Sequence, residues 1–149
     1  MHEDIKEIIL KIILTTILCG MIGLERGLRH KNAGMRTHIL VGIGSALITL
    51  TSFFIFAIFK NETVVDPTRM ISSIITGIGF LCAGTIIRGG TNVIGLTTAA
   101  SLWIVSALGM AVGCGQYLAA IIVTVVTLTV LVLLRPIERF FEKYFINLK

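Results

Sequence analysis

The chain has 149 residues, of which 55% are hydrophobic and only 14% are charged, and its mean hydropathy is +0.95. This balance excludes a water-soluble globular domain, because most of the surface of such a chain must face lipid. The 13 basic residues outnumber the 8 acidic ones, and in a membrane protein this excess indicates orientation rather than binding to nucleic acid.

Apolar runs follow one another along the chain, and each is long enough to cross a membrane as a helix. We predict transmembrane helices at residues 5–24, 37–59, 68–87, 96–114 and 117–134. Lipid offers backbone amides and carbonyls no partner, so each run must satisfy them internally as a helix. The predicted fold class is an all-α membrane protein, a bundle of five transmembrane helices forming a single domain over residues 1–149.

Charged residues flanking the runs predict the orientation. The linker at residues 25–36 and the tail at residues 135–149 are rich in Lys and Arg, and the linker after the third run carries Arg88. The basic residues on the other side are offset by acidic ones. The positive-inside rule therefore places the N-terminus outside and the C-terminus in the cytoplasm. The tail, with aromatic residues among charges, predicts a short amphipathic helix on the inner interface. Lys11, near the outer end of the first helix, is expected to reach the interface with its long side chain.

Four charged residues fall at the predicted cytoplasmic ends of helices: Glu25, Arg26, Arg36 and Arg88. Ionisable groups at membrane depth are costly and often functional. They predict either an interface ion-pair network or a polar vestibule for an ion, a phosphate-bearing ligand or a partner protein. Glu25 and Arg29 stand four residues apart on a helix, so they are expected to pair.

Asp66-Pro67 directly precedes the third run. Asp is a favoured helix N-cap and Pro is favoured at the first helical position, so capping is the first interpretation. Arg69 is close enough in sequence to pair with Asp66. The alternative is that Asp66, with Glu62 nearby, offers carboxylate oxygens to a divalent cation entering from outside.

The linker between the third and fourth helices contains three glycines and Asn92. Thr97 or Thr98 is expected to cap the fourth helix. The segment reads as a tight inner loop, or as a site where the helix N-terminus receives an anion or carbonyl group.

Glycines predict close contacts between helices, either within one bundle or in a dimer. Two pairs have GxxxG spacing, Gly23 with Gly27 and Gly109 with Gly113. Packing positions are also expected in the third helix, at Gly77, Gly79 and Gly84.

Catalysis and structural metal binding are not expected. The cysteines form no CxxC pair and read as small buried residues. The histidines stand at no metal-ligand spacing from a Cys or a carboxylate. The hydroxyls of Thr97, Thr98 and Ser101 are expected to have no His nearby to activate them, so the chain is predicted not to be an enzyme.

Five short motifs follow one another along the chain in an order that is typical of one protein family. The motifs are GLERG at 23–27, AGMRTH at 33–38, DPTR at 66–69, GIGFLCAGTI at 77–86 and GLTTAA at 95–100. Together they resemble the MgtC/SapB family of bacterial inner-membrane proteins, and the resemblance extends from about residue 8 to residue 134. By resemblance, the functional positions are Glu25, Arg26, Arg36, Asp66, Arg69 and residues 77–85.

The resemblance implies an inner-membrane protein of magnesium-linked physiology, in a family also connected with virulence. Two roles are open: a Mg²⁺ transporter or ion-binding protein, and a regulator of other membrane machinery such as the ATP synthase or a cation transporter. The chain departs from the family pattern in two ways. Cys82 occupies a position where the family usually has Gly, and the cytoplasmic C-terminal domain of longer members is expected to be absent.

The coordination chemistry of Mg²⁺ helps to compare these two roles. Mg²⁺ requires near-octahedral oxygen ligands, usually one or two carboxylates plus waters, and no carboxylate lies in the middle of a predicted span. Glu25 and Asp66 remain speculative metal ligands, because they are expected at opposite faces of the membrane. We expect the bilayer, a second copy in a homodimer and another membrane protein as partners, and no cofactor apart from Mg²⁺ as ligand or substrate.

Overall fold

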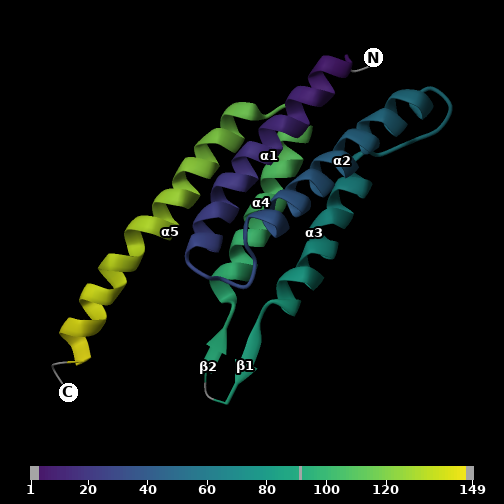
Figure 1. Ribbon diagram of the computed structural model, residues 1–149. Coiled ribbons are helices and arrows are strands. Elements are labelled where there is room, and N and C mark those ends of the chain that lie inside the picture. The colour runs from purple at the N-terminus through teal and green to yellow at the C-terminus, as the bar shows by residue number, and fades with distance from the viewer. Residues whose placement is uncertain (1–3, 91, 147–149) are drawn as a thin grey trace.

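The computed structural model describes residues 4–90 and 92–146 as a helical bundle with one short β-hairpin (Figure 1). Its elements are α1 (Ile5–Leu28), α2 (Met35–Phe59), α3 (Thr68–Gly84), β1 (Ile87–Gly89), β2 (Asn92–Ile94), α4 (Leu96–Gly113) and α5 (Tyr117–Ile146). Four helical segments are long and apolar enough to span a membrane: α1, α2, α4 and the Tyr117–Ile137 part of α5. The prediction of an all-helical membrane fold is confirmed at this level.

The third helix is shorter than predicted. It has 17 residues and ends at Gly84 rather than at residue 87, which leaves it just below the length of the four candidate spans. It ends there because the following residues form an antiparallel hairpin, in which Ile87 pairs with Ile94 and Arg88 with Val93. β-Branched residues flank a glycine turn in this segment, a pattern that favours a hairpin, and Gly90 has a φ of 62°. The predicted tight loop is therefore a β-hairpin.

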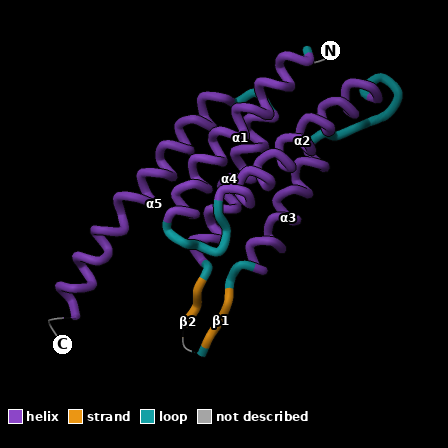
Figure 2. The backbone as a smooth tube through the Cα atoms, viewed as in Figure 1, coloured by secondary structure: helices purple, strands orange, loops and turns teal. Residues whose placement is uncertain are grey.

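The fifth helix is longer than predicted. It continues without a break to Ile146, and Figure 2 shows one continuous helix where we predicted a span followed by a separate amphipathic helix. Pro136 lies inside it. Proline lacks the backbone N–H and usually ends or kinks a helix, but this helix continues past it. The boundary predicted at residue 135, where charged and aromatic residues replace the apolar run, is therefore wrong. The end of the tail, residues 147–149, lies outside the described residues.

The fourth helix is the centre of the bundle, and it contacts α1, α2, α3 and α5. Its apolar side meets α1 and the start of α5 in a buried cluster made of Leu18, Cys19, Ile22, Val105, Leu108, Val112 and Ala120. Apolar residues on the outer faces of α3 and α5 are exposed, for example Phe80 and Leu118. Such outer faces suit lipid as the surrounding solvent.

Glycines allow α1, α2 and α4 to approach closely. A Cβ atom at Gly23 would lie 2.7 Å from Met35 Cα, and one at Gly109 would clash with the Gly42 carbonyl. At Gly113 it would lie 2.8 Å from Thr49 Cβ. The predicted close contacts at these positions are thus made inside one bundle.

The third-helix glycines behave differently. A Cβ atom at Gly77, Gly79 or Gly84 would meet no atom within 4 Å. Within the described chain, these glycines do not serve the close packing we predicted for them.

The bundle has two distinct ends (Figure 1). The α1–α2 loop, the β-hairpin and the C-terminal part of α5 lie toward one end, which we call the hairpin end. The N-terminus, the α2–α3 loop and the α4–α5 turn lie toward the other, which we call the N-terminal end. Which end faces the cytoplasm stays a prediction.

Candidate functional site

Arg26 is buried between helices at the hairpin end. It lies near the end of α1 and is 4% exposed, and its guanidinium Nη2 donates a hydrogen bond to Thr98 Oγ1 at 3.1 Å. Thr98 lies in the first turn of α4, but it is not the helix cap. The cap is Gly95, with a φ of 95°, and the Ala99 amide donates to its carbonyl. The predicted capping of α4 by Thr97 or Thr98 is therefore wrong, and the Thr98 hydroxyl instead accepts a hydrogen bond from Arg26.

His38 extends this contact from α4 to α2. Its side chain is fully buried, with Nδ1 2.9 Å from the Gly34 carbonyl and Nε2 3.0 Å from Ser101 Oγ. Ser101 Oγ is also 2.8 Å from the Thr98 carbonyl, to which it can donate. The expectation that Ser101 has no His nearby was wrong, since the two meet across the helix interface. We call Arg26, Thr98, Ser101 and His38 the buried polar chain.

The hydrogens of this chain are constrained. A carbonyl only accepts, so His38 Nδ1 must carry a hydrogen. In the neutral ring Nε2 then accepts, and Ser101 gives its single hydrogen either to Nε2 or to the Thr98 carbonyl. In the charged ring Nε2 donates to Ser101 Oγ, and the serine hydrogen is directed to Thr98. The position of the serine hydrogen is therefore linked to the protonation of His38.

Glu25 lies next to Arg26 in sequence but pairs with another residue. Its Oε1 accepts from Arg29 Nε across one helical turn, as predicted. Its side chain is 9% exposed. Among the described residues, Glu25 Oε2 and Arg26 Nε are buried without a hydrogen-bond partner. Buried unpaired polar atoms are costly and call for an explanation in a folded protein.

The other predicted members of the charged cluster lie apart from it. Arg36 is exposed at the start of α2, and Arg88 is exposed on β1. Within the described residues, no hydrogen bond or ion pair joins either of them to Glu25 or Arg26. Asn92 and Thr97 are also exposed. The predicted vestibule of four charges is reduced to Glu25 and Arg26, with Arg29 in addition.

Asp66 lies at the opposite end of the bundle, and its side chain bonds to Thr68, the first residue of α3. Its Oδ1 accepts from the Thr68 amide at 2.8 Å and from Thr68 Oγ1 at 2.7 Å. These hydrogen bonds, with a smaller contribution from the charge of Arg69, lower the pKa of Asp66 below its usual value. As the capping interpretation predicted, Asp66 accepts hydrogen bonds at the start of α3. The helix begins at Thr68, as the predicted span did, but the N-cap position is occupied by Pro67, so Asp66 lies one residue before it and Pro67 is not the first helical residue.

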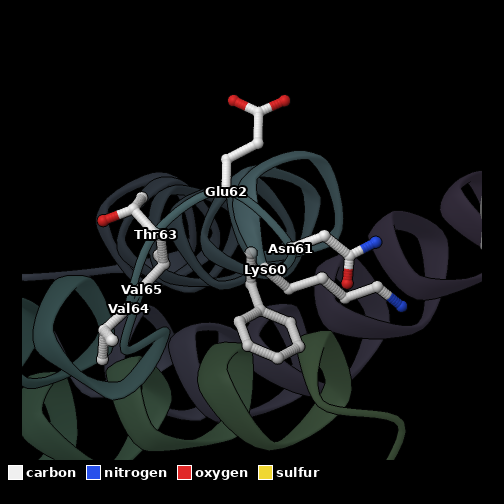
Figure 3. Close-up of a pocket in the computed structure, with 7 residues that line it drawn as sticks. Lys60, Asn61, Glu62, Thr63, Val64 and Val65 are labelled. Carbon is white, nitrogen blue, oxygen red and sulfur yellow. The ribbon is translucent and has the colours of Figure 1, made fainter.

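The outer cation site receives no support from this geometry. The α2–α3 loop borders an open pocket of about 450 Å³ lined by Phe56 and residues 60–65. Figure 3 shows the Glu62 carboxylate pointing away from the Lys60 and Asn61 side chains. Across the described parts of the chain, no three His, Cys, Asp or Glu residues gather in a way that could hold a metal. Glu25 and Asp66, proposed as metal ligands, lie at opposite ends.

A polar stripe along α2 was missed by the sequence analysis. His38, Ser45, Thr49 and Ser52 are all buried. Ser45 Oγ lies 2.9 Å from Ser106 Oγ of α4, Thr49 donates to the Ser45 carbonyl, and Ser52 donates to the Pro67 carbonyl. Their spacing of seven, four and three residues puts them on one helix face, and this periodicity was the available signal.

These features define a polytopic membrane protein whose bundle buries charged and hydroxyl groups between α1, α2 and α4. The chain belongs to the MgtC family, whose sequence profile matches residues 12–140.

Curated relatives match most of this chain but only part of their own length. The protein named "Putative magnesium transporter YhiD" of Escherichia coli (strain K12) is 45% identical over 127 residues, covering 84% of this chain and 59% of the relative. Protein MgtC of Brucella abortus (strain 2308) is 42% identical over 128 residues, covering 85% and 50%. Protein MgtC of Salmonella typhimurium (strain 14028s / SGSC 2262) is 39% identical over 127 residues, covering 85% and 52%. No solved structure matches the chain.

Proposed function

We propose that the chain is a non-enzymatic protein of the bacterial inner membrane that regulates other membrane machinery in magnesium-linked physiology. The observation that carries this proposal is the setting of Arg26. Its buried positive charge is held by the neutral hydroxyl of Thr98, while the neighbouring carboxylate of Glu25 pairs with Arg29. A fixed positive charge repels Mg²⁺, which needs several oxygen ligands.

The packing of the interior supports the same role. Gly109 of α4 lies against the Gly42 carbonyl of α2, and Gly113 lies against Thr49. At the same interface of α2 and α4 the hydroxyls of Ser45 and Ser106 bond to each other. Mg²⁺ is reluctant to lose its waters, and helices in such close contact leave no space between them for a hydrated ion. The arrangement suits helices that move or dock as a unit.

Transport is the second candidate, favoured by one observation. Glu25 Oε2 is buried without a partner among the described residues, and a homodimer that brings two Glu25 carboxylates together would create a cation site. The name of the Escherichia coli relative YhiD also describes a magnesium transporter. In this alternative the dimer, rather than a single bundle, is the transporting unit.

Magnesium flux into sealed liposomes distinguishes the two roles. We expect purified protein to give no more Mg²⁺ entry than empty vesicles, with insertion verified by protease protection. If the wild type gives Mg²⁺ flux that is lost in Glu25→Gln but retained in Glu62→Gln, the proposal of regulation is rejected in favour of transport. Glu62 is a suitable control because it is an exposed carboxylate at the other end of the bundle.

The proposal of regulation also requires that a partner protein be detected. In cells grown at low magnesium, crosslinking before solubilisation in mild detergent should capture a second membrane protein, such as the ATP synthase or a cation transporter. Arg26→Met should reduce this capture while Lys31→Met, at an exposed loop position, should not. Recovery of a homo-oligomer alone, with an unchanged low-magnesium phenotype in Arg26→Met, would count against regulation.

A further inference from the structure

A cavity of about 620 Å³ lies at the N-terminal end of the bundle, far from the buried polar chain. Its walls come from the first turns of α1 and the second half of α2, and residues 113–115 of the α4–α5 turn also line it. Pockets of this volume with mainly apolar walls and a few polar groups are typical of small-molecule sites.

The walls combine apolar and cationic groups. Leu47, Leu50, Phe53 and Phe54 of α2 supply apolar surface, and Lys11 and Lys60 supply positive charge. Glu7 is the acidic residue in the lining, so the lining carries a net positive charge.

Lys11 does not behave as the sequence predicted. Its side chain does not snorkel outward, because it is 3% exposed, and its Nζ lies 3.3 Å from Glu7 Oε1. The Glu7 side chain is 47% exposed, so the exposed member of this ion pair is the carboxylate, and the ammonium of Lys11 lies beneath it. Lys60, at the end of α2, is exposed and adds a second positive charge to the lining of the cavity.

The position of the cavity relates it to the bilayer. The α4–α5 turn joins two candidate spans, and a turn between spans lies near the membrane surface. The rim continues onto exposed apolar side chains, with Leu47 57% and Phe54 56% exposed. A ligand can therefore enter sideways from the lipid, with its polar group at the surface and its apolar part against α2.

We propose that this cavity binds an anionic phospholipid. The headgroup phosphate interacts with the exposed ammonium of Lys60, and an acyl chain lies along Leu47, Leu50, Phe53 and Phe54. The charge of the lining selects an anionic over a zwitterionic headgroup, because each Lys near a membrane surface contributes about 1 kcal/mol toward anionic lipid. This role is independent of the regulatory function proposed above.

The test measures lipid binding by native mass spectrometry of the purified full chain. The probes are phosphatidylglycerol, phosphatidylcholine of the same acyl chains, and inorganic phosphate. We expect phosphatidylglycerol to bind more tightly than phosphatidylcholine, and inorganic phosphate not to displace it. Lys60→Gln should weaken phosphatidylglycerol binding about fivefold, the equivalent of the loss of one such charge, while Lys31→Gln at the hairpin end should leave it unchanged.

A second pair of variants tests the apolar part. Ala57→Trp places an indole in the cavity and should reduce lipid retention, whereas Val126→Trp, on an exposed face of α5, should not. If Ala57→Trp fails to fold, the Lys60 and Lys31 pair decides. Equal binding of the two lipids, insensitive to Lys60→Gln, would overturn the proposal in favour of general annular lipid. Full displacement by inorganic phosphate would overturn it in favour of a simple anion site.

Discussion

Arg26 of α1 and Thr98 of α4 are 72 residues apart in the chain, and their side chains are joined by a buried hydrogen bond of 3.1 Å. This bond ties the end of the first helix to the beginning of the fourth. It also brings a charged group to the start of the buried polar chain that continues through Ser101 to His38.

Removing the Thr98 hydroxyl should destabilise the bundle. Thr98→Val keeps the shape of the side chain but leaves the Arg26 guanidinium without its acceptor, and an unpaired buried donor costs about 1–3 kcal/mol. Thermal unfolding in detergent should show a lower Tm. Thr97→Val is the matched control, because Thr97 is its exposed neighbour. Equal Tm values for the two variants would show that the bond contributes nothing to stability.

The tautomer of His38 should be fixed by its carbonyl partner. We expect the neutral ring to carry its hydrogen on Nδ1, because Gly34 O can only accept. Nitrogen-15 NMR of histidine-labelled protein distinguishes the two ring nitrogens, and His30, which is exposed, provides a reference signal. A hydrogen found on Nε2 in the neutral ring would contradict the hydrogen-bond assignment.

Some of these relationships were predictable from sequence and others were not. Helix positions followed from hydropathy, because lipid permits no other backbone structure. The pairing of Glu25 with Arg29 followed from helical spacing, and the hydrogen bonding of Asp66 at the start of α3 followed from local chemistry. Each of these needs only neighbouring residues.

The contact of His38 with Ser101 cannot be predicted from neighbouring residues alone. The two residues are 63 positions apart, and their meeting depends on how far each helix is rotated and where it crosses its neighbour. The polar stripe of α2 marks one face of the helix, but it does not say which neighbouring helix that face meets or at what height. The hairpin at residues 87–94 was missed for a different reason. Ile86 and Ile87 extended the apparent third span as far as the first strand, and the glycine-containing segment after it was interpreted as a loop, although β-branched residues pair there across a turn.

The crossing of α2 and α4 should tolerate no side chain at Gly109. Gly109→Ala places a methyl group against the Gly42 carbonyl, and overpacking of this kind costs about 1–3 kcal/mol. Unfolding in a mixed-detergent titration should show the loss. Gly44→Ala is the control, because a Cβ atom there meets no atom within 4 Å, and replacing a helical Gly by Ala should stabilise by up to about 1 kcal/mol. Equal destabilisation by both variants would contradict the close contact.

The start of α3 should depend on pH through Asp66. Because the pKa of Asp66 is lowered in the folded state by its bonds to Thr68, its contribution is fully present above the unfolded pKa and is lost as the pH falls through the folded pKa. The protection of the Thr68 amide against hydrogen exchange, corrected for the intrinsic pH dependence, should fall over that acidic range. In Asp66→Asn the carboxylate is absent, so protection should no longer change with pH there. Glu62→Gln, in the same exposed loop, should keep the wild-type profile. A pH dependence that survives in Asp66→Asn would assign the loss of protection to another group and would show that the carboxylate does not protect the start of α3.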